Sequence, residues 1–286
     1  MTHPTLGYEG RSSGLFYGLA GLLVAAATWA GPAWSLDCAA PLWGAHTGLT
    51  RSQWDETSAQ GRTLVRERGT LNFAGITVDG ACARWQWRLA LTRSTGVRAY
   101  DGVTSTNFPL QTSSGISITD ASAQVWTPAI AQWSGGLRVN HRQLDRDIAG
   151  VGLVVRGYPE QFSYWQAAAG LRHEVALGDG LVLTGEGWIG GGPAGTMLLR
   201  LPNADPAQLT LGTSRLAEIG LQLGSPARAP GTVGWSWHAR VDYQWQAMAA
   251  GPATTLFRNG VPVGGAAQPA TRQQALGVGA AVHYRF

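Results

Sequence analysis

The stretch VGWSWHARVDYQWQ, residues 233–246, decides the fold of this chain. From Trp235 on, the odd-numbered positions are apolar or aromatic, whereas the even-numbered positions are polar or charged. A strict period of two is the pattern of a β-strand that separates two different environments. On the apolar face, aromatic residues lie near both ends and small aliphatic residues lie between them, in the order Trp235, Trp237, Ala239, Val241, Tyr243 and Trp245.

This spacing of aromatic residues fits a strand that crosses a lipid bilayer. Eight residues at a rise of about 3.3 Å and a tilt of about 40° span about 20 Å, close to the apolar band of about 25 Å between the aromatic girdles of a membrane barrel. Trp and Tyr favour such boundaries because each joins an apolar body to a polar group. Residues 83–93, ARWQWRLALTR, alternate in the same way.

The composition agrees with a barrel and excludes other classes of protein. Charged residues make up 13% of the chain, whereas soluble domains carry about 25%. Beyond the N-terminus no apolar run approaches the roughly 18–20 residues of a membrane helix. The 13 Trp argue against disorder, and the 2 Cys argue against a disulfide-rich fold. We therefore predict an all-β protein, an antiparallel transmembrane β-barrel.

The C-terminus strengthens this interpretation, because residues 276–286 alternate again and the chain stops on Phe286. A final amphipathic strand that ends in aromatic residues, here Tyr284 and Phe286, resembles the assembly signal of bacterial outer-membrane β-barrel proteins. The resemblance implies export, insertion by the barrel-assembly machinery, and a C-terminus on the periplasmic side of a Gram-negative outer membrane. It implies nothing about activity.

Ten strands are expected, since single-chain bacterial barrels have an even number. Periplasmic turns are short and outer loops are long, which sets the topology. Eight or twelve strands are the alternatives, because the first strand is weakly marked and residues 148–156 could form an additional strand or a pair of arms above the membrane. The expected strands are 43–54, 62–74, 82–94, 118–127, 134–145, 161–177, 181–190, 209–223, 233–246 and 271–286. The expected outer loops are 55–61, 95–117, 146–160, 191–208 and 247–270, and the inner turns are 75–81, 128–133, 178–180 and 224–232.

Residues 1–35 have the pattern of a secretory signal peptide. Arg11 precedes an apolar stretch at 15–29, and small residues at 33 and 35 fit a cleavage site before Leu36. An uncleaved anchor is the alternative, although the apolar stretch is short for a membrane span. The barrel is then expected to comprise residues 36–286.

The two cysteines, Cys38 and Cys82, both lie in the exported part of the chain. An even number in an oxidising compartment suggests one disulfide, with two free thiols as the alternative. The expected topology brings Cys82 to the periplasmic end of its strand, near the mature N-terminus that carries Cys38.

The strand pattern predicts a lumen rich in arginine. A ten-stranded barrel is narrow, so its interior is largely filled by side chains. Paired charges that plug the barrel are one interpretation, and a narrow path that favours anions is the other. The expected inward residues are Arg66, Arg68, Arg84, Arg88, Arg138, Arg142, Arg172, Glu174, Glu186, Glu218, His238, Arg240, Asp242, His283 and Arg285.

Other arginines are expected at the outer rim or in outer loops, where they could pair with lipopolysaccharide phosphates or remain solvated. These are Arg93, Arg98, Arg156, Arg200 and Arg258. The net charge of +4 does not indicate nucleic-acid binding, because the sequence contains no basic run. We expect outer-membrane lipid and lipopolysaccharide as surroundings, and a monomer.

The length and strand number also resemble those of the omptin proteases, whose mouths carry an Asp-x-Asp pair and an Asp-x-His pair. Asp145 and Asp147 match the first pair, but no histidine follows an aspartate at the second spacing. His141, near the outer rim and close in sequence to Asp145, is the one histidine that we consider as a catalytic base of a Ser/His hydrolase. No metal site and no cofactor are indicated by the residue spacing.

The sequence therefore predicts an integral outer-membrane barrel with a structural or surface-interaction role. It favours a protein without enzymatic activity over an enzyme. A narrow anion-favouring pore is the first alternative. A hydrolase with its site at the extracellular rim is the second.

Overall fold

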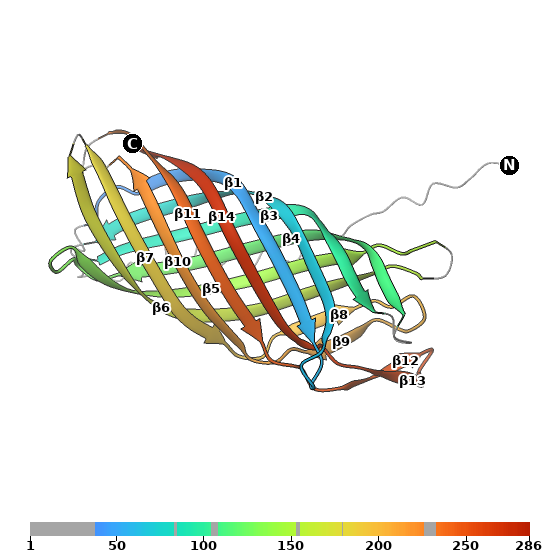
Figure 1. Cartoon of the computed structure of the whole chain (residues 1–286). Helices are drawn as coiled ribbons and strands as arrows, with labels where there is room; N and C mark the ends of the chain where they lie inside the picture. The colour runs from blue at the N-terminus through green and yellow to red at the C-terminus, as the bar shows by residue number, and fades with distance from the viewer. Residues whose placement is uncertain (1–37, 83–84, 104–107, 153–154, 179, 226–232) are drawn as a thin grey trace. The chain divides into compact units, whose positions relative to one another are not determined.

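The structure is a computed structural model that describes residues 38–82, 85–103, 108–152, 155–178, 180–225 and 233–286 (Figure 1). The alternating segments form long strands, and among these residues no helix is long and apolar enough to cross a membrane. The strands are β1 (Leu42–Thr57), β2 (Thr63–Cys82), β3 (Trp85–Val103), β4 (Pro109–Trp126), β5 (Trp133–Ile148), β6 (Tyr158–Gly178), β7 (Leu181–Gly192), β8 (Thr196–Leu199), β9 (Ala207–Thr210), β10 (Ser214–Gly224), β11 (Gly234–Met248), β12 (Thr254–Arg258), β13 (Val261–Ala266) and β14 (Ala270–Arg285).

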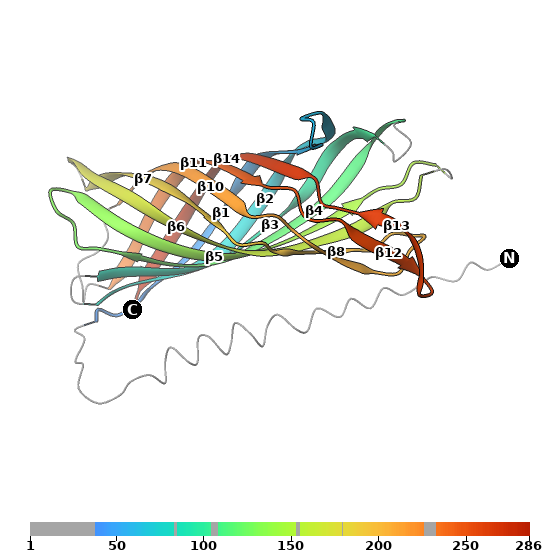
Figure 2. The ribbon, with the colours of Figure 1, turned by 90° about the horizontal axis from the view of Figure 1, so that it is seen from below.

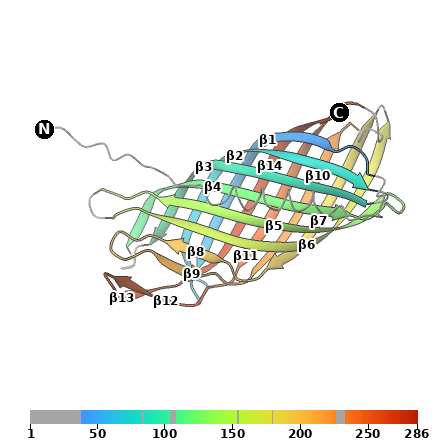
Figure 3. The same cartoon turned by 180° about the vertical axis from the view of Figure 1, so that it is seen from behind.

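Ten of these strands form a closed antiparallel barrel, which confirms the predicted fold and strand number. The ring runs β1-β2-β3-β4-β5-β6-β7-β10-β11-β14, and β14 pairs with β1 along the full length of β1. Figure 3 shows β2 to β6 side by side on the far wall of the view in Figure 1. Closure removes the free sheet edges that a membrane would not tolerate.

Two further strand pairs lie at one end of the barrel. The short strand β8 pairs with residues 160–163 of β6, and β9 pairs with β8, so this ribbon extends the wall beyond β7 and β10. Pro193, which has no N–H to donate, stands between β7 and β8. The hairpin of β12 and β13 lies at the same end, opposite the C-terminus (Figure 2). We call this end the hairpin end, and the opposite end, which carries Cys38 and Phe286, the disulfide end.

The outer wall carries an apolar band bordered by aromatic residues, as a membrane-facing wall requires. Toward the disulfide end the aromatic residues are Trp43, Trp85, Trp133, Trp235, Trp237 and Phe286, and toward the hairpin end they include Trp165 and Tyr243, all exposed. Exposed aliphatic residues lie between them, among them Leu49, Ile76, Val139, Leu171, Ile189, Leu221, Val241 and Val278.

The predicted turn at 75–81 is wrong, because β2 runs through it to Cys82. Its glycines serve close packing instead of a turn. A Cβ on Gly80 would lie 2.2 Å from the ring of Trp87, and a Cβ on Gly75 would lie 2.5 Å from the imidazole of His46. The turn at 178–180 does use glycine for backbone freedom, with φ of +85° at Gly178 and +72° at Gly180.

The outer loops were predicted too long. β3 continues to Val103, β4 begins at Pro109, β5 ends at Ile148 and β6 begins at Tyr158. The β8–β9 ribbon and the β12–β13 hairpin occupy the other two long loops, and β10 begins only at Ser214. Beyond the bilayer the outer face no longer needs to be apolar, so the alternation weakens in the sequence while strand pairing continues. A strand such as β2, with 20 residues, spans about 50 Å at a rise of about 3.3 Å and a tilt of about 40°.

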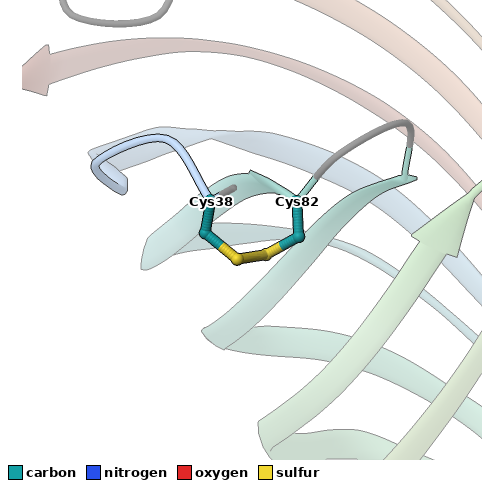
Figure 4. The surroundings of a disulfide bond; sticks show 2 residues. All are labelled: Cys38 and Cys82. Atoms are coloured by element: carbon teal, nitrogen blue, oxygen red, sulfur yellow. A yellow bond between two sulfur atoms is a disulfide. The ribbon is translucent and has the colours of Figure 1, made fainter. Parts of the chain in front are cut away.

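At the disulfide end, Cys38 and Cys82 form a disulfide bond, with Cα atoms 3.9 Å apart (Figure 4). The N–H of Ala39 donates to the carbonyl of Ala81, 2.9 Å away, which holds the same segments together. The bond therefore ties the segment before β1 to the end of β2. The expected signal peptide, residues 1–35, and the inner turn at 226–232 lie outside the described residues.

Candidate functional site

A buried arginine lies inside the barrel toward the hairpin end. Arg146 of β5 forms ion pairs with Glu56 of β1 at 2.7 Å, Glu67 of β2 at 2.8 Å and Glu160 of β6 at 2.8 Å. We call these four residues the Arg146 cluster. Its guanidinium is 2% exposed, and buried charge is costly unless it is paired. Because β1 and β6 stand opposite each other in the ten-strand ring, the cluster spans the lumen.

A second buried arginine extends this cluster. Arg98 of β3 is fully buried and lies 3.6 Å from Glu67. It donates to the hydroxyl of Ser52 at 2.7 Å, while the hydroxyl of Ser114 donates to Glu67 at 2.6 Å. Side chains of six strands, β1 to β6, therefore meet in one hydrogen-bonded layer across the lumen.

An apolar layer adjoins the Arg146 cluster. Trp54 of β1 packs edge-on against Phe162 of β6, with ring centroids 5.6 Å apart. The indole N–H of Trp54 donates to Glu56 at 2.9 Å and so joins the apolar layer to the charged one. The other buried members are Leu71, Ile116, Ile118, Leu144, Tyr164, Met197, Leu199, Leu209, Leu211 and Met248.

On the disulfide-end side of the apolar layer, Arg142 of β5 reaches across the lumen. Its guanidinium pairs with Asp120 at 2.6 Å and donates to Gln246 of β11 at 3.0 Å. Gln246 in turn donates to the hydroxyl of Tyr164 at 2.9 Å. One layer further, Glu218 of β10 lies between two arginines, Arg138 and Arg240, each 2.9 Å away.

The interior is more open toward the disulfide end. A cavity of about 260 Å³ lies beside Arg142 and Glu218. A second cavity of about 480 Å³ shares Arg88, His238 and His283 with the first and also contacts Arg172, Glu174, Glu186 and Arg285. Arg88 pairs with Asp79. Arg172 donates to Gln86 at 2.5 Å across the lumen and stacks on Trp126 at 4.7 Å.

The charge of the lumen is balanced, whereas the sequence predicted an excess of arginine. The carboxylates that the sequence reading missed are Glu56, Glu67, Asp79, Asp120 and Glu160, each of which pairs with an inward arginine or, for Asp79, with His283 as well. Glu56, Arg98, Arg146 and Glu160 fell in predicted loops. The other residues that were predicted inside line the two cavities. They are Arg88, Arg138, Arg142, Arg172, Glu174, Glu186, Glu218, His238, Arg240, Asp242, His283 and Arg285.

For three further arginines that were predicted inside, the prediction is wrong for two, and the third lies outside the described residues. Arg66 and Arg68 were expected inside, but both lie exposed on the outer wall, where Arg66 pairs with Asp55 at 2.8 Å and Arg68 donates to Gln53 at 3.1 Å. The predicted turn at 75–81 concealed that alternation continues from Ile76 back to Arg66 on one face. Arg84 is not among the described residues.

The expected outer-rim arginines also divide. The prediction for Arg98 is wrong, because this side chain is buried in the lumen. Arg93 is exposed on the outer wall of β3, and Arg156, Arg200 and Arg258 are exposed at the hairpin end.

The three catalytic candidates all lie on the outer wall of β5, because they alternate with the inward Arg142, Leu144 and Arg146. His141 contacts the hydroxyl of Ser163 on β6, with Nε2 2.9 Å from Oγ. Asp145 accepts from Gln161 at 2.8 Å and no contact between Asp145 and His141 is formed in the described structure. Asp147 is exposed. The described residues contain no group of three potential metal ligands.

Comparison with known proteins places this geometry in context. No protein-family profile matches the sequence, and no curated protein matches it. The outer membrane protease OmpT from Escherichia coli superposes with a TM-score of 0.52 at 10% identity, over 90% of this chain and 99% of that one. The chain has the fold of an outer-membrane β-barrel.

Other outer-membrane barrels match less well. The translocator domain of the autotransporter NalP from Neisseria meningitidis gives a TM-score of 0.37 at 11% identity, over 95% of this chain and 96% of that domain. The toluene transporter TodX from P. putida gives 0.32 at 11% identity, over 86% and 90% of the two chains. At 10% identity, the likeness to OmpT describes the fold of this chain and not its activity.

Proposed function

We propose that this outer-membrane β-barrel is a closed structural and surface-interaction protein and not a diffusion pore. The observation that carries the proposal is the contact across the lumen between opposite strands, through the Arg146 cluster and through Trp54 and Phe162. Both layers lie between the cavities and the hairpin end. A solute that enters from the disulfide end therefore meets a packed interior.

The balanced charge supports the same proposal. An anion-favouring pore needs unpaired positive charge along its path, because rings of one sign set selectivity. Here each arginine next to the closed layers is held by carboxylates, Arg146 by three and Arg142 by Asp120. Their attraction for a passing anion is therefore largely neutralised.

Liposome swelling tests the proposal. Vesicles that contain the purified full chain and entrapped dextran should not swell faster in isotonic arabinose or potassium chloride than empty vesicles. A general porin at the same protein-to-lipid ratio serves as the positive control. Swelling in potassium chloride that slows when Arg88 or Arg240 is replaced by Ser would instead establish the pore.

We also propose the orientation and the route of assembly. Residues 1–35 act as a cleaved signal peptide, and the barrel-assembly machinery recognises Tyr284 and Phe286 of the last strand. The disulfide end then faces the periplasm and the hairpin end faces the outside. Export to an oxidising compartment is consistent with the disulfide between Cys38 and Cys82. A monomer is sufficient, because the ring is closed by its own strands.

The surface partner that we propose is lipopolysaccharide. Four exposed arginines lie on the outer wall of the adjacent strands β14, β1 and β2, toward the hairpin end. The guanidinium fork suits phosphate oxygens. Replacement of two of them by Ser should lower the amount of lipopolysaccharide that copurifies, whereas Arg258→Ser at the hairpin should not. The four are Arg51, Arg66, Arg68 and Arg272.

A further inference from the structure

The outer wall, which the proposed function does not use for chemistry, carries a contact of a kind found in hydrolases. His141 of β5 and Ser163 of β6 lie on the same face, two positions apart in the strand register, with Nε2 2.9 Å from Oγ. This distance is within hydrogen-bond reach and lets the imidazole accept the hydroxyl proton. Neither side chain is buried, so a substrate can approach from the lipid side.

The position of His141 and Ser163 relative to the apolar band of the outer wall indicates the class of substrate. Along β5 the outward residues on the disulfide-end side of His141 are apolar, Leu137 and Val139, and those on the other side are polar, Gln143 and Asp145. On β6 the same change occurs between Trp165 and Ser163. The pair therefore lies at the edge of the apolar band. Acyl esters of membrane lipids lie at the same boundary between hydrocarbon and headgroup.

Neighbouring side chains complete the surroundings. The imidazole of His141 packs on the indole of Trp165, with centroids 4.8 Å apart, which restricts its rotation. Gln143 stands directly opposite Ser163 in the strand register. Its amide is 3.4 Å from the Asp145 carboxylate, a long hydrogen bond, so it can turn toward a ligand. Asp145 itself is bound by Gln161 at 2.8 Å and takes no part.

We propose that Ser163 and His141 hydrolyse an acyl ester of a membrane lipid in the leaflet at the hairpin end. The Ser163 oxygen attacks the ester carbonyl while His141 takes the hydroxyl proton. The carbon–oxygen bond to the lipid alcohol breaks, and His141 returns the proton to the leaving alkoxide. Water then attacks the acyl-serine with His141 as base, which releases the fatty acid and restores Ser163. The Gln143 amide donates to the oxyanion in both steps.

Two lipids offer this ester, a glycerophospholipid and the acylated lipid of lipopolysaccharide. The full chain is folded into vesicles of phosphatidylethanolamine and phosphatidylglycerol with labelled acyl chains, and separately into vesicles that contain lipopolysaccharide. Released fatty acid is measured in each. The variants are Ser163→Ala, His141→Gln and Gln143→Ala, with Ser117→Ala as control, since Ser117 lies on the outer wall of β4 beside Asp145. Band shift on heating in SDS verifies folding of every variant.

We expect release from one of the two lipids that falls at least about 100-fold in Ser163→Ala and His141→Gln, less in Gln143→Ala, and not in Ser117→Ala. We also expect a fluorophosphonate probe to modify the folded wild-type protein at Ser163, as located by mass spectrometry, and not His141→Gln. The lipid that releases acid identifies the source of the ester. Release that persists in folded Ser163→Ala, or a folded wild-type protein that releases no acid from either lipid, overturns the proposal. None of these results depends on whether the lumen conducts.

Discussion

Trp54 and Phe162 lie on opposite strands of the barrel and nevertheless touch, edge to face, with centroids 5.6 Å apart. Both side chains are almost completely buried, at 2% and 0% exposure. A contact between the first strand and the sixth can form only through the middle of the lumen. The two rings therefore fill the barrel where a pore would need to be open.

Removal of one ring should destabilise the barrel. Trp54→Ala is expected to lower the free energy of unfolding by about 3–5 kcal/mol, because it deletes a large buried side chain and leaves a cavity. Urea titration in detergent, followed by tryptophan fluorescence and by the gel shift, measures the loss. Leu49→Ala on the lipid-facing side of the same strand is the control and should cost less. Equal losses would show that the interior is not tightly packed.

Loss of a buried ion pair should lower the stability of the barrel far more than loss of an exposed one. Arg146→Leu removes the cation shared by three buried carboxylates, of which only Glu67 keeps another, Arg98 at 3.6 Å. It should cost at least about 3 kcal/mol. Arg66→Leu removes an exposed pair with Asp55, which should change stability by less than about 1 kcal/mol. The comparison is made by the same urea titration. A similar effect of both replacements would contradict the buried network.

The Arg146→Leu variant should also acquire an unusual pH dependence. Burial raises the pKa of Glu160 to about 7, and the Arg146 cation opposes this shift. Without Arg146, the folded barrel therefore binds a proton at Glu160 more readily than the unfolded chain does. Its stability should therefore rise as the pH falls from about 8 toward 5, and Glu160→Gln in the same variant should reduce this gain. Stability of Arg146→Leu that falls steadily as the pH falls from about 8 to 5 would contradict a Glu160 carboxyl buried without its cation.

Loss of the disulfide should act at the disulfide end. Cys38→Ser together with Cys82→Ser removes a link between residues 44 apart in sequence, worth about 2–4 kcal/mol when it restricts the unfolded chain. The expected result is a lower temperature for the band shift in SDS, and the same decrease when the wild-type protein is reduced. Reduction that lowers this temperature further in the double variant would point to a different cause.

The last residue should matter for assembly. Phe286 is 75% exposed and packs edge-on against Tyr284 at 4.8 Å, so Phe286→Ser disturbs the terminal strand without emptying the interior. Outer-membrane fractions should contain less of this variant, while Phe257→Ser in the β12–β13 hairpin should leave the amount unchanged. Equal amounts of both would mean that the terminus is not the assembly signal.

Much of the fold was predictable because the bilayer imposes a strict pattern. Between the aromatic girdles every second side chain must be apolar, and residues 233–246 show this directly. Beyond the bilayer the constraint ends, so the far halves of β3 and β4 looked like loops. The inward face of Arg98 and Arg146 was hidden for the same reason.

The candidate sites were harder to predict than the fold. The alternation along β5 placed His141 and Asp145 on one face, but a sequence does not give the register between β5 and β6. Only that register brings Ser163 next to His141. Likewise, the partners of Arg146 come from three strands far apart in sequence, and no local pattern links them. A consistent parity from Ile76 back to Arg66 would have put Glu67 inside.

The most direct test of the closed lumen is conductance across a planar bilayer that contains the folded wild-type barrel, recorded in 1 M potassium chloride at both voltage polarities. We predict no stable current steps in the wild-type protein. Steps that recur at one size, favour anions and become smaller when Arg88 or Arg240 is replaced by Ser would contradict the closed lumen and establish a pore.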